Sequence, residues 1–208
     1  MKVYYSITYP HGACSYYRSI GPWSKLPGVD FIPLPAQMSW NTIYDATAVY
    51  IERPCTEQQM KIMQIAQRNN IPVIVDFDDD VINLPSDNRG YPYFSQPQVQ
   101  QMVKWAIANA DCVMVSTQHI KNVYSEFSQK GNIVVVNNAF NDFHYDLNYS
   151  AFSRNKIFNW RGSDIHIRDL MPSMPALKQV YAQRPDWQWN FIGADIYNIM
   201  MSQHFPKY

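Results

Sequence analysis

The sequence predicts an α/β fold with a mainly parallel β-sheet, followed by the beginning of a second unit of the same kind. Short apolar runs alternate with helix-like stretches along the chain, which is the order that βαβ units produce. The run PVIVDF at 72–77 shows no polar alternation before its acid, as expected of a strand covered on both faces. A strand–glycine–helix pattern at 157–170 repeats the opening of such a unit late in the chain.

Each expected strand of the first unit is a short run dominated by apolar, β-branched or tyrosine residues. In chain order these runs are 2–8 (KVYYSIT), 29–34 (VDFIPL), 46–51 (ATAVYI), 72–77 (PVIVDF), 112–116 (CVMVS) and 133–136 (IVVV). Helical stretches separate most of them, and this alternation favours a parallel sheet.

The expected helices of the first unit show apolar residues at three- and four-residue spacing. They cover 15–26, 56–69, 98–110 and 118–129. We expect an interruption of the first helix near Gly21–Pro22, since proline lacks a backbone N–H. Thr56 suits the N-cap of the second helix. A polar, proline-rich loop is expected from Asp80 through Pro92.

A polar and aromatic stretch without sustained periodicity covers 141–155, and we place the domain boundary there. One domain is therefore expected over 1–145 and a second over 155–208. Within the second, the pattern predicts a strand at 156–160, a helix at 165–183 and a strand at 187–192. Pro172 and Pro175 are expected to start or kink that helix.

The composition excludes several classes of protein. Seventeen basic residues balance seventeen acidic ones, so no global field attracts nucleic acid or an anionic membrane. The three cysteines are widely spaced, which indicates neither a disulfide framework nor a zinc site. We find no signal-peptide pattern and no apolar run near the roughly 18 residues of a transmembrane helix, so we expect a cytoplasmic protein.

Aromatic residues make up 15% of the chain, whereas charged residues make up only 16%. Aromatic rings favour core packing first, and surfaces that stack on sugar or base rings second.

Four acidic residues cluster at the carboxyl end of the strand at 72–77, namely Asp76, Asp78, Asp79 and Asp80. Ligands of open α/β sheets bind at such strand ends. Carboxylates this close repel one another unless a cation, an arginine or ligand hydroxyls offset the charge. The cluster is interpreted in three ways: a divalent-metal site, a set of hydrogen-bond acceptors for a sugar, or a solvated loop that caps the next element.

A second candidate segment directly follows the first strand and comprises Gly12, Cys14, Ser15, Tyr16, Tyr17 and Arg18. A glycine at this place lets the backbone approach a ligand, and Arg18 can bind a phosphate or carboxylate through two N–H groups. The same glycine is also ordinary for a turn between strand and helix. The dinucleotide fingerprint Gly-x-Gly-x-x-Gly is absent.

The third candidate cluster lies in the late strand–glycine–helix pattern and comprises Arg161, Gly162, Ser163, His166 and Asp169. Such a junction presents backbone N–H groups and the positive end of a helix dipole, which suits phosphate. His166 and Asp169 share one helix face because they are three residues apart. In the alternative interpretation Ser163 or Asp164 is simply the N-cap, and Arg161 is solvated.

Four landmarks together resemble the group-1 glycosyltransferases, which are retaining enzymes of the GT-B fold, and especially their bacterial and phage branch. In order they are Gly12–Arg18 (GACSYYR), PVIVDFDDD with Leu84–Pro85, Ala110–Thr117 (ADCVMVST), and Trp160-Arg161-Gly162-Ser163-x-x-His166-x-x-Asp169. The landmarks span residues 1 to about 195, which is nearly the whole chain.

The resemblance implies two Rossmann-like domains with doubly wound parallel sheets that face a cleft. The first would hold the acceptor, and the second the diphosphate of a nucleotide-sugar donor, with no metal or further cofactor. Asp78 takes the place of a histidine that many family members have near the reacting sugar, so it is the catalytic candidate. The substrate-binding candidates are Gly12, Tyr16, Tyr17, Arg18, Asp76 and Asp79, and the donor-binding candidates are Arg161, Gly162, Ser163 and His166.

The resemblance also implies an incomplete second domain. The match ends at Phe191–Gly193, ahead of the paired glutamates that hold the donor in the family. The segment beyond 155 is far shorter than the roughly 100–150 residues of a common domain. We therefore expect either a fragment or a naturally short protein, whose uncovered sheet edges and apolar faces favour self-association.

Three functions remain open from the sequence. The first is metal-independent transfer of a sugar from a nucleotide-sugar to a saccharide, lipid or protein acceptor. The second is a metal-dependent transferase that uses Asp76-x-Asp78 as its metal motif. The third is a non-catalytic module that binds carbohydrate or a partner chain through an aromatic-rich surface.

Overall fold

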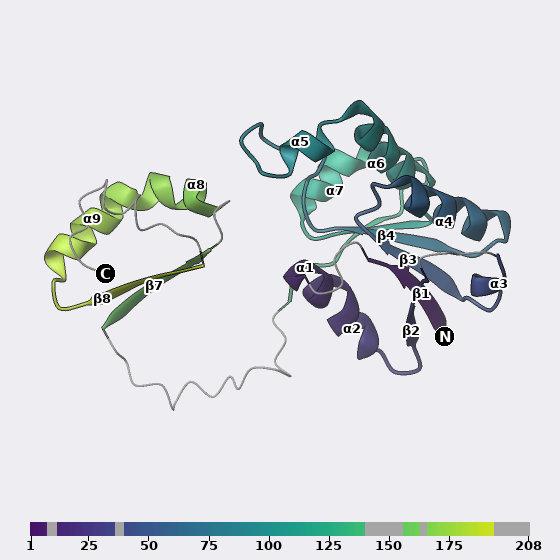
Figure 1. Cartoon of the computed structure of the whole chain (residues 1–208), viewed down its shortest axis with the longest axis horizontal. Helices are drawn as coiled ribbons and strands as arrows, with labels where there is room; N and C mark the ends of the chain where they lie inside the picture. The colour runs from purple at the N-terminus through teal and green to yellow at the C-terminus, as the bar shows by residue number, and fades with distance from the viewer. Residues whose placement is uncertain (8–11, 36–39, 140–155, 163–165, 194–208) are drawn as a thin grey trace. The chain divides into compact units, whose positions relative to one another are not determined.

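The computed structural model describes residues 1–7, 12–35, 40–139, 156–162 and 166–193 (Figure 1). The chain folds into two compact units, Met1–Tyr145 and Asp146–Tyr208, and each is described by itself. None of the helices in the described ranges is both long and apolar enough to cross a membrane.

The first unit is built on a six-stranded sheet in which every pair of neighbours is parallel. Its strands are β1 (Lys2–Ser6), β2 (Asp30–Pro33), β3 (Ala48–Glu52), β4 (Val73–Phe77), β5 (Cys112–Val115) and β6 (Ile133–Val135). The strand order is β2-β1-β3-β4-β5-β6, so the chain winds outward from β1 and then returns to continue on its other side. This is a doubly wound, Rossmann-like α/β fold, and its winding direction reverses between β1 and β3.

Helices cover both faces of this sheet (Figure 1). The helical elements are α1 (Ala13–Ser15), the π-helix η1 (Tyr16–Ile20), α2 (Gly21–Ser24), α3 (Trp40–Ile43), α4 (Glu57–Arg68), α5 (Tyr91–Phe94), α6 (Pro97–Asn109) and α7 (Gln118–Ser125). On one face α4, α6 and α7 pack over strand residues such as Val49 and Val75 to form the main core. On the other face α2 contributes Trp23 to a smaller core around Val3 and Tyr50.

Most element types match the sequence expectation, and the differences have local causes. Thr56 caps α4 through a complete capping box with Gln59, as its residue type predicts. The helix expected over 15–26 begins earlier and contains a π-helical turn that ends at Gly21, whose N–H reaches the Tyr16 carbonyl. A Cβ on Gly21 would lie 2.8 Å from that carbonyl oxygen, so the turn requires glycine. The short α3 and α5 were not expected, because four residues are too few to show a period.

The second unit is a single βαβ motif in the described ranges. Its elements are β7 (Ile157–Gly162), α8 (Ile167–Leu170), the 3₁₀ turn η4 (Met171–Ser173), α9 (Met174–Gln183) and β8 (Gln188–Gly193). The strands β7 and β8 pair in parallel and form a sheet separate from that of the first unit. Leu170 and Met174 pack under the sheet against Trp160 and Phe191. The expected helix over 165–183 is thus interrupted by η4, where Pro172 lies.

Candidate functional site

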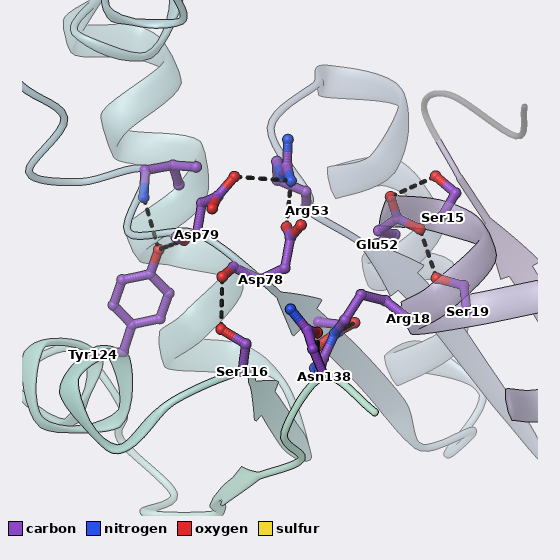
Figure 2. Close-up of polar contacts among 12 residues, drawn as sticks. Ser15, Arg18, Ser19, Glu52, Arg53, Asp78, Asp79, Ser116, Tyr124 and Asn138 are labelled. Carbon is purple, nitrogen blue, oxygen red and sulfur yellow. Dashed lines mark hydrogen bonds and ion pairs between the residues drawn. The ribbon is translucent and has the colours of Figure 1, made fainter. Parts of the chain in front are cut away.

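The carboxyl ends of the parallel strands share one edge of the first sheet, and polar side chains gather there (Figure 2). We call this region the carboxyl edge. In doubly wound sheets, ligands bind outside this edge at the point where the winding direction reverses. That point lies between β1 and β3 here. The acids at the end of β4 and the segment after β1 meet next to it, where Arg18 contacts Asp76.

A buried ion pair between Arg18 and Asp76 joins these two segments. The guanidinium approaches the carboxylate with Nε 3.0 Å from Oδ2 and Nη2 2.5 Å from Oδ1, which is the bidentate geometry that arginine favours. The two side chains are only 3% and 1% exposed. Arg18 also donates to the Val136 carbonyl and, at 3.2 Å, to Asn138 Oδ1, so it holds the end of β6 as well.

Burial raises the pKa of Asp76, and the Arg18 guanidinium opposes this rise. The Tyr50 hydroxyl donates a further hydrogen bond to Asp76 Oδ2 at 2.9 Å. The candidates Arg18 and Asp76 therefore do come together, but they bind each other, and this geometry makes them positioning residues of the edge.

Glu52 lies at the end of β3 and forms hydrogen bonds with two serines of the first helical segment. Ser15 Oγ is 2.7 Å from Oε1, and Ser19 Oγ is 2.6 Å from Oε2 (Figure 2). Glu52, Ser15 and Ser19 are all buried. Tyr50, Glu52 and Asp76 alternate with the apolar strand residues of the main core, so they face the side that carries η1.

A count of hydrogens indicates that the chain of contacts between Glu52 and Asp76 holds one additional proton. Three oxygen–oxygen contacts run from Glu52 to Ser19 (2.6 Å), from Ser19 to Tyr50 (2.9 Å) and from Tyr50 to Asp76 (2.9 Å). The two hydroxyl groups supply only two hydrogens for these three contacts. A proton on the carboxyl group of Glu52 or of Asp76 supplies the third. Burial raises the pKa of both groups, but the Arg18 guanidinium opposes the rise at Asp76, which favours Glu52 as the protonated group.

Arg53 follows Glu52 directly and has an uncommon backbone conformation. Its φ of 46° lies in the left-handed region that residues with a side chain rarely adopt. Its guanidinium pairs with Asp78, and with Asp79 Oδ2 at 3.3 Å (Figure 2). Its Nε is buried and has no hydrogen-bond partner among the described residues. Arg53 thus combines a strained backbone conformation with a buried, unsatisfied N–H group, and such outliers concentrate at functional sites.

The charge of Arg53 keeps Asp78 ionised. Burial by itself would raise the pKa of Asp78, but the guanidinium lowers it below the usual value. Asp78 is 9% exposed and Asp79 is 63% exposed, so one carboxylate is shielded from solvent and the other is exposed to it. Partial burial of the Cys14 thiol and the nearby Asp78 carboxylate raise the pKa of Cys14 to about 11. Cys14 is therefore a neutral thiol at neutral pH, and a thiolate nucleophile is disfavoured.

Hydroxyl groups of two other segments bind the backbone of the loop that carries the acids. Ser116 donates to the Asp78 carbonyl at 2.6 Å, and Tyr124 donates to the Asp79 carbonyl at 3.1 Å (Figure 2). Asp80 instead accepts hydrogen bonds from the backbone N–H groups of Ile82 and Asn83, both at 3.1 Å. Asp80 therefore caps a turn. This agrees with the third interpretation of the acidic cluster, a loop that caps the next element.

The remaining candidates of the first unit lie beside this network. Gly12 is the N-cap of α1 with an extended backbone. Tyr16 and Tyr17 belong to η1, their rings meet edge to face at a centroid distance of 5.3 Å, and Tyr17 is 36% exposed. Their proposed contacts with substrate remain predictions.

The donor-binding candidates belong to the second unit. Arg161 and Gly162 end β7, and a Cβ on Gly162 would lie 2.7 Å from the Trp160 ring, so a larger residue here would have to displace that ring. His166 Nδ1 lies 2.9 Å from Asp169 Oδ2, and both side chains are exposed. Ser163 lies outside the described residues. The helix that would direct its dipole at a phosphate is the four-residue α8, which is shorter than expected.

Sequence reasoning did not single out four members of the carboxyl edge, namely Ser19, Tyr50, Glu52 and Arg53. It named Ser15 but did not predict its hydrogen bond to Glu52. Glu52 ends an apolar strand and Arg53 follows it, just as Asp76 lies at the end of its strand and Asp78 follows it, so the same argument would have found them. Ser15, Arg18 and Ser19 are spaced to share one helical face, and a polar face at that point signals a polar core.

The arginines offset the carboxylates that the sequence places together. Arg18 pairs with Asp76, and Arg53 pairs with Asp78 and Asp79. Among the residues that the structure describes, no three His, Cys, Asp or Glu side chains gather as metal ligands. Both oxygens of Asp76 already accept hydrogen bonds, so the Asp76-x-Asp78 pair does not fit a metal in this arrangement.

Comparison of the sequence with protein-family models and with curated proteins found no match.

We expect the buried pair to show strong coupling in a double-mutant cycle. Arg18→Met or Asp76→Leu leaves one buried charge unpaired, so each should lower the free energy of unfolding by about 3–5 kcal/mol in urea denaturation. The double variant should lose clearly less than the sum. Lys130→Met breaks an exposed pair with Asp111 and should cost at most about 1 kcal/mol. Additive losses in the double variant would contradict a paired, ionised Arg18–Asp76.

The pH dependence of the stability of Glu52→Gln tests whether Glu52 carries a proton. Because the folded pKa of Glu52 is raised, its stabilising contribution is complete below the ordinary value and is lost as pH rises through the folded pKa. The amide of the variant imitates the neutral acid at every pH. The stability of Glu52→Gln relative to the wild type should therefore increase as pH rises from 4.5, as measured by urea denaturation across pH. A relative gain of the wild type with rising pH would show that Glu52 is ionised.

Proposed function

We propose that this chain is, or forms part of, a glycosyltransferase that moves a sugar from a nucleotide-sugar to a glycan-type acceptor. The observation that carries the proposal is the ion-paired cluster around Arg53 and Asp78 at the carboxyl edge, next to the point where the doubly wound sheet reverses direction. The four sequence landmarks that resemble group-1 glycosyltransferases support it, since PVIVDFDDD contains Asp78 and Gly12–Arg18 contains Cys14, which lies beside Asp78.

In this proposal Asp78 is the catalytic residue. An ionised carboxylate in a shielded position can stabilise the positive charge that develops on a sugar as its bond to the leaving group lengthens. Asp78 has these properties because Arg53 lowers its pKa and Ser116 holds its backbone. Arg18 and Asp76 position the segment after β1 instead of touching substrate.

The departing diphosphate would be stabilised in the second unit by Arg161 and by backbone N–H groups near Gly162, with His166 beside them. Arg161 is exposed and lies at the carboxyl end of β7, which is the corresponding ligand edge of a parallel sheet. In this scheme cationic side chains and backbone amides stabilise the negative charge of the diphosphate, and no metal ion is required. The paired state of Asp76 supports a metal-independent reaction over a metal-dependent one.

The test combines binding and turnover for the 208-residue chain. Calorimetry with UDP- and GDP-sugars in EDTA should show binding of at least one donor, and release of nucleoside diphosphate should be unaffected by EDTA. Asp78→Asn should reduce this release by about 10²–10³-fold, because one stabilising charge is lost. Glu126→Gln is the matched control, since Glu126 is exposed at the end of α7 and thus at the opposite edge of the sheet.

Each contrary outcome identifies another function. Strict dependence on manganese would favour the metal-dependent transferase. Donor or glycan binding without transfer would indicate a non-catalytic binding module. Unchanged turnover in Asp78→Asn would remove Asp78 from the mechanism.

A further inference from the structure

The short helix α5 carries two tyrosine rings on the surface of the first unit, although this segment was expected to be a loop. Tyr91 is 36% exposed and Tyr93 is 42% exposed. Phe94, by contrast, packs against the main core, and its ring meets that of Tyr93 edge to face at a centroid distance of 5.2 Å. The helix lies at the periphery of the unit, next to α6 (Figure 1).

Hydrogen bonds tie α5 to the carboxyl edge. The Tyr93 hydroxyl donates to the Cys55 carbonyl at 3.2 Å, and Cys55 lies two residues after Arg53. The Gln100 amide donates to the carbonyls of Phe94 at 2.8 Å and Val81 at 3.2 Å, and so joins α5 to the loop of the acids. The Tyr93 ring is therefore held at its hydroxyl and by its contact with Phe94, beside the loop that carries Arg53.

Charge decides which kind of ligand suits this place. Asp78 and Asp79 bring two negative charges and Arg53 brings one positive charge, so this cluster of three side chains is net negative. An anionic diphosphate is disfavoured there. A neutral saccharide fits, because its hydroxyls bind carboxylates and guanidinium groups while the C–H face of its ring packs on an aromatic side chain.

We propose that the Tyr93 ring, the Asp79 carboxylate and the Arg53 guanidinium form a subsite for a neutral saccharide unit of the acceptor. This assignment rests on the proposed glycosyltransferase function. Tyr93 supplies the packing surface, and Asp79, which is 63% exposed, accepts hydrogen bonds from sugar hydroxyls. A fixed ring loses little conformational freedom when the sugar packs on it, which favours binding.

The test measures glycan and donor binding on the same variants of the full chain. Binding to an array of neutral glycans gives the saccharide affinity, and calorimetry with UDP- and GDP-sugars gives the donor affinity. Tyr93→Leu should weaken glycan binding about tenfold, whereas Tyr93→Phe, which keeps the ring, should stay within about twofold of the wild type. Asp79→Asn should also weaken glycan binding. None of these variants should change the donor affinity.

Tyr44→Leu is the matched control. Tyr44 is 68% exposed, and its neighbour Asp45 pairs with Lys2 at the start of β1, so it lies at the opposite edge of the same sheet. This variant should bind glycans as the wild type does. Thermal unfolding of Tyr93→Leu and Tyr93→Phe establishes that both variants are folded.

The outcomes separate this subsite from the proposed function. Glycan binding that depends on Tyr93, without any donor binding, would support the subsite and overturn the glycosyltransferase. Donor binding and transfer with a glycan affinity insensitive to Tyr93→Leu would overturn the subsite alone. Failure to bind any neutral glycan on the array, or a donor affinity that falls with Tyr93→Leu, would also overturn the subsite.

Discussion

The buried ion pair between Arg18 and Asp76 is the interaction on which the arrangement of the carboxyl edge depends. It links η1 to β4, and through the Val136 carbonyl it also reaches the end of β6. Two charges removed from water are stable only as partners, since an unpaired one would be costly. The pair therefore fixes where the segment after β1 lies, and with it Gly12 and Cys14, at the point where the winding of the sheet reverses.

Around this pair the molecule concentrates polar groups and strain in a small region. A chain of hydroxyl contacts connects Asp76 with Glu52, and the next residue, Arg53, has a left-handed backbone and a buried Nε without a partner in the described part of the chain. Rigid hydrogen-bonded networks specify one arrangement and leave little freedom for alternatives. A catalytic or binding site benefits from such preorganisation, because its groups need not reorder when the ligand arrives.

The sequence predicts the parallel α/β architecture and the acids at the strand ends, since both follow from local patterns such as PVIVDF. It does not predict that Arg18 pairs with Asp76, because the two are 58 residues apart and only the fold brings them together. The π-turn of η1 and the four-residue α5 were missed for a different reason: both are too short to show the repeating pattern by which helices are recognised. The tyrosines of α5 therefore entered the site only once the structure had placed them.

The most direct test of this account is an NMR measurement of the ionisation and exchange of Arg18 and Asp76 in the intact chain at neutral pH. The account predicts that the Asp76 carboxyl carbon has the chemical shift of an ionised group and that the Arg18 Nε–H exchanges with water far more slowly than that of the exposed Arg68. A protonated Asp76, or an Arg18 that exchanges as fast as Arg68, would show that no buried ionic link organises the edge.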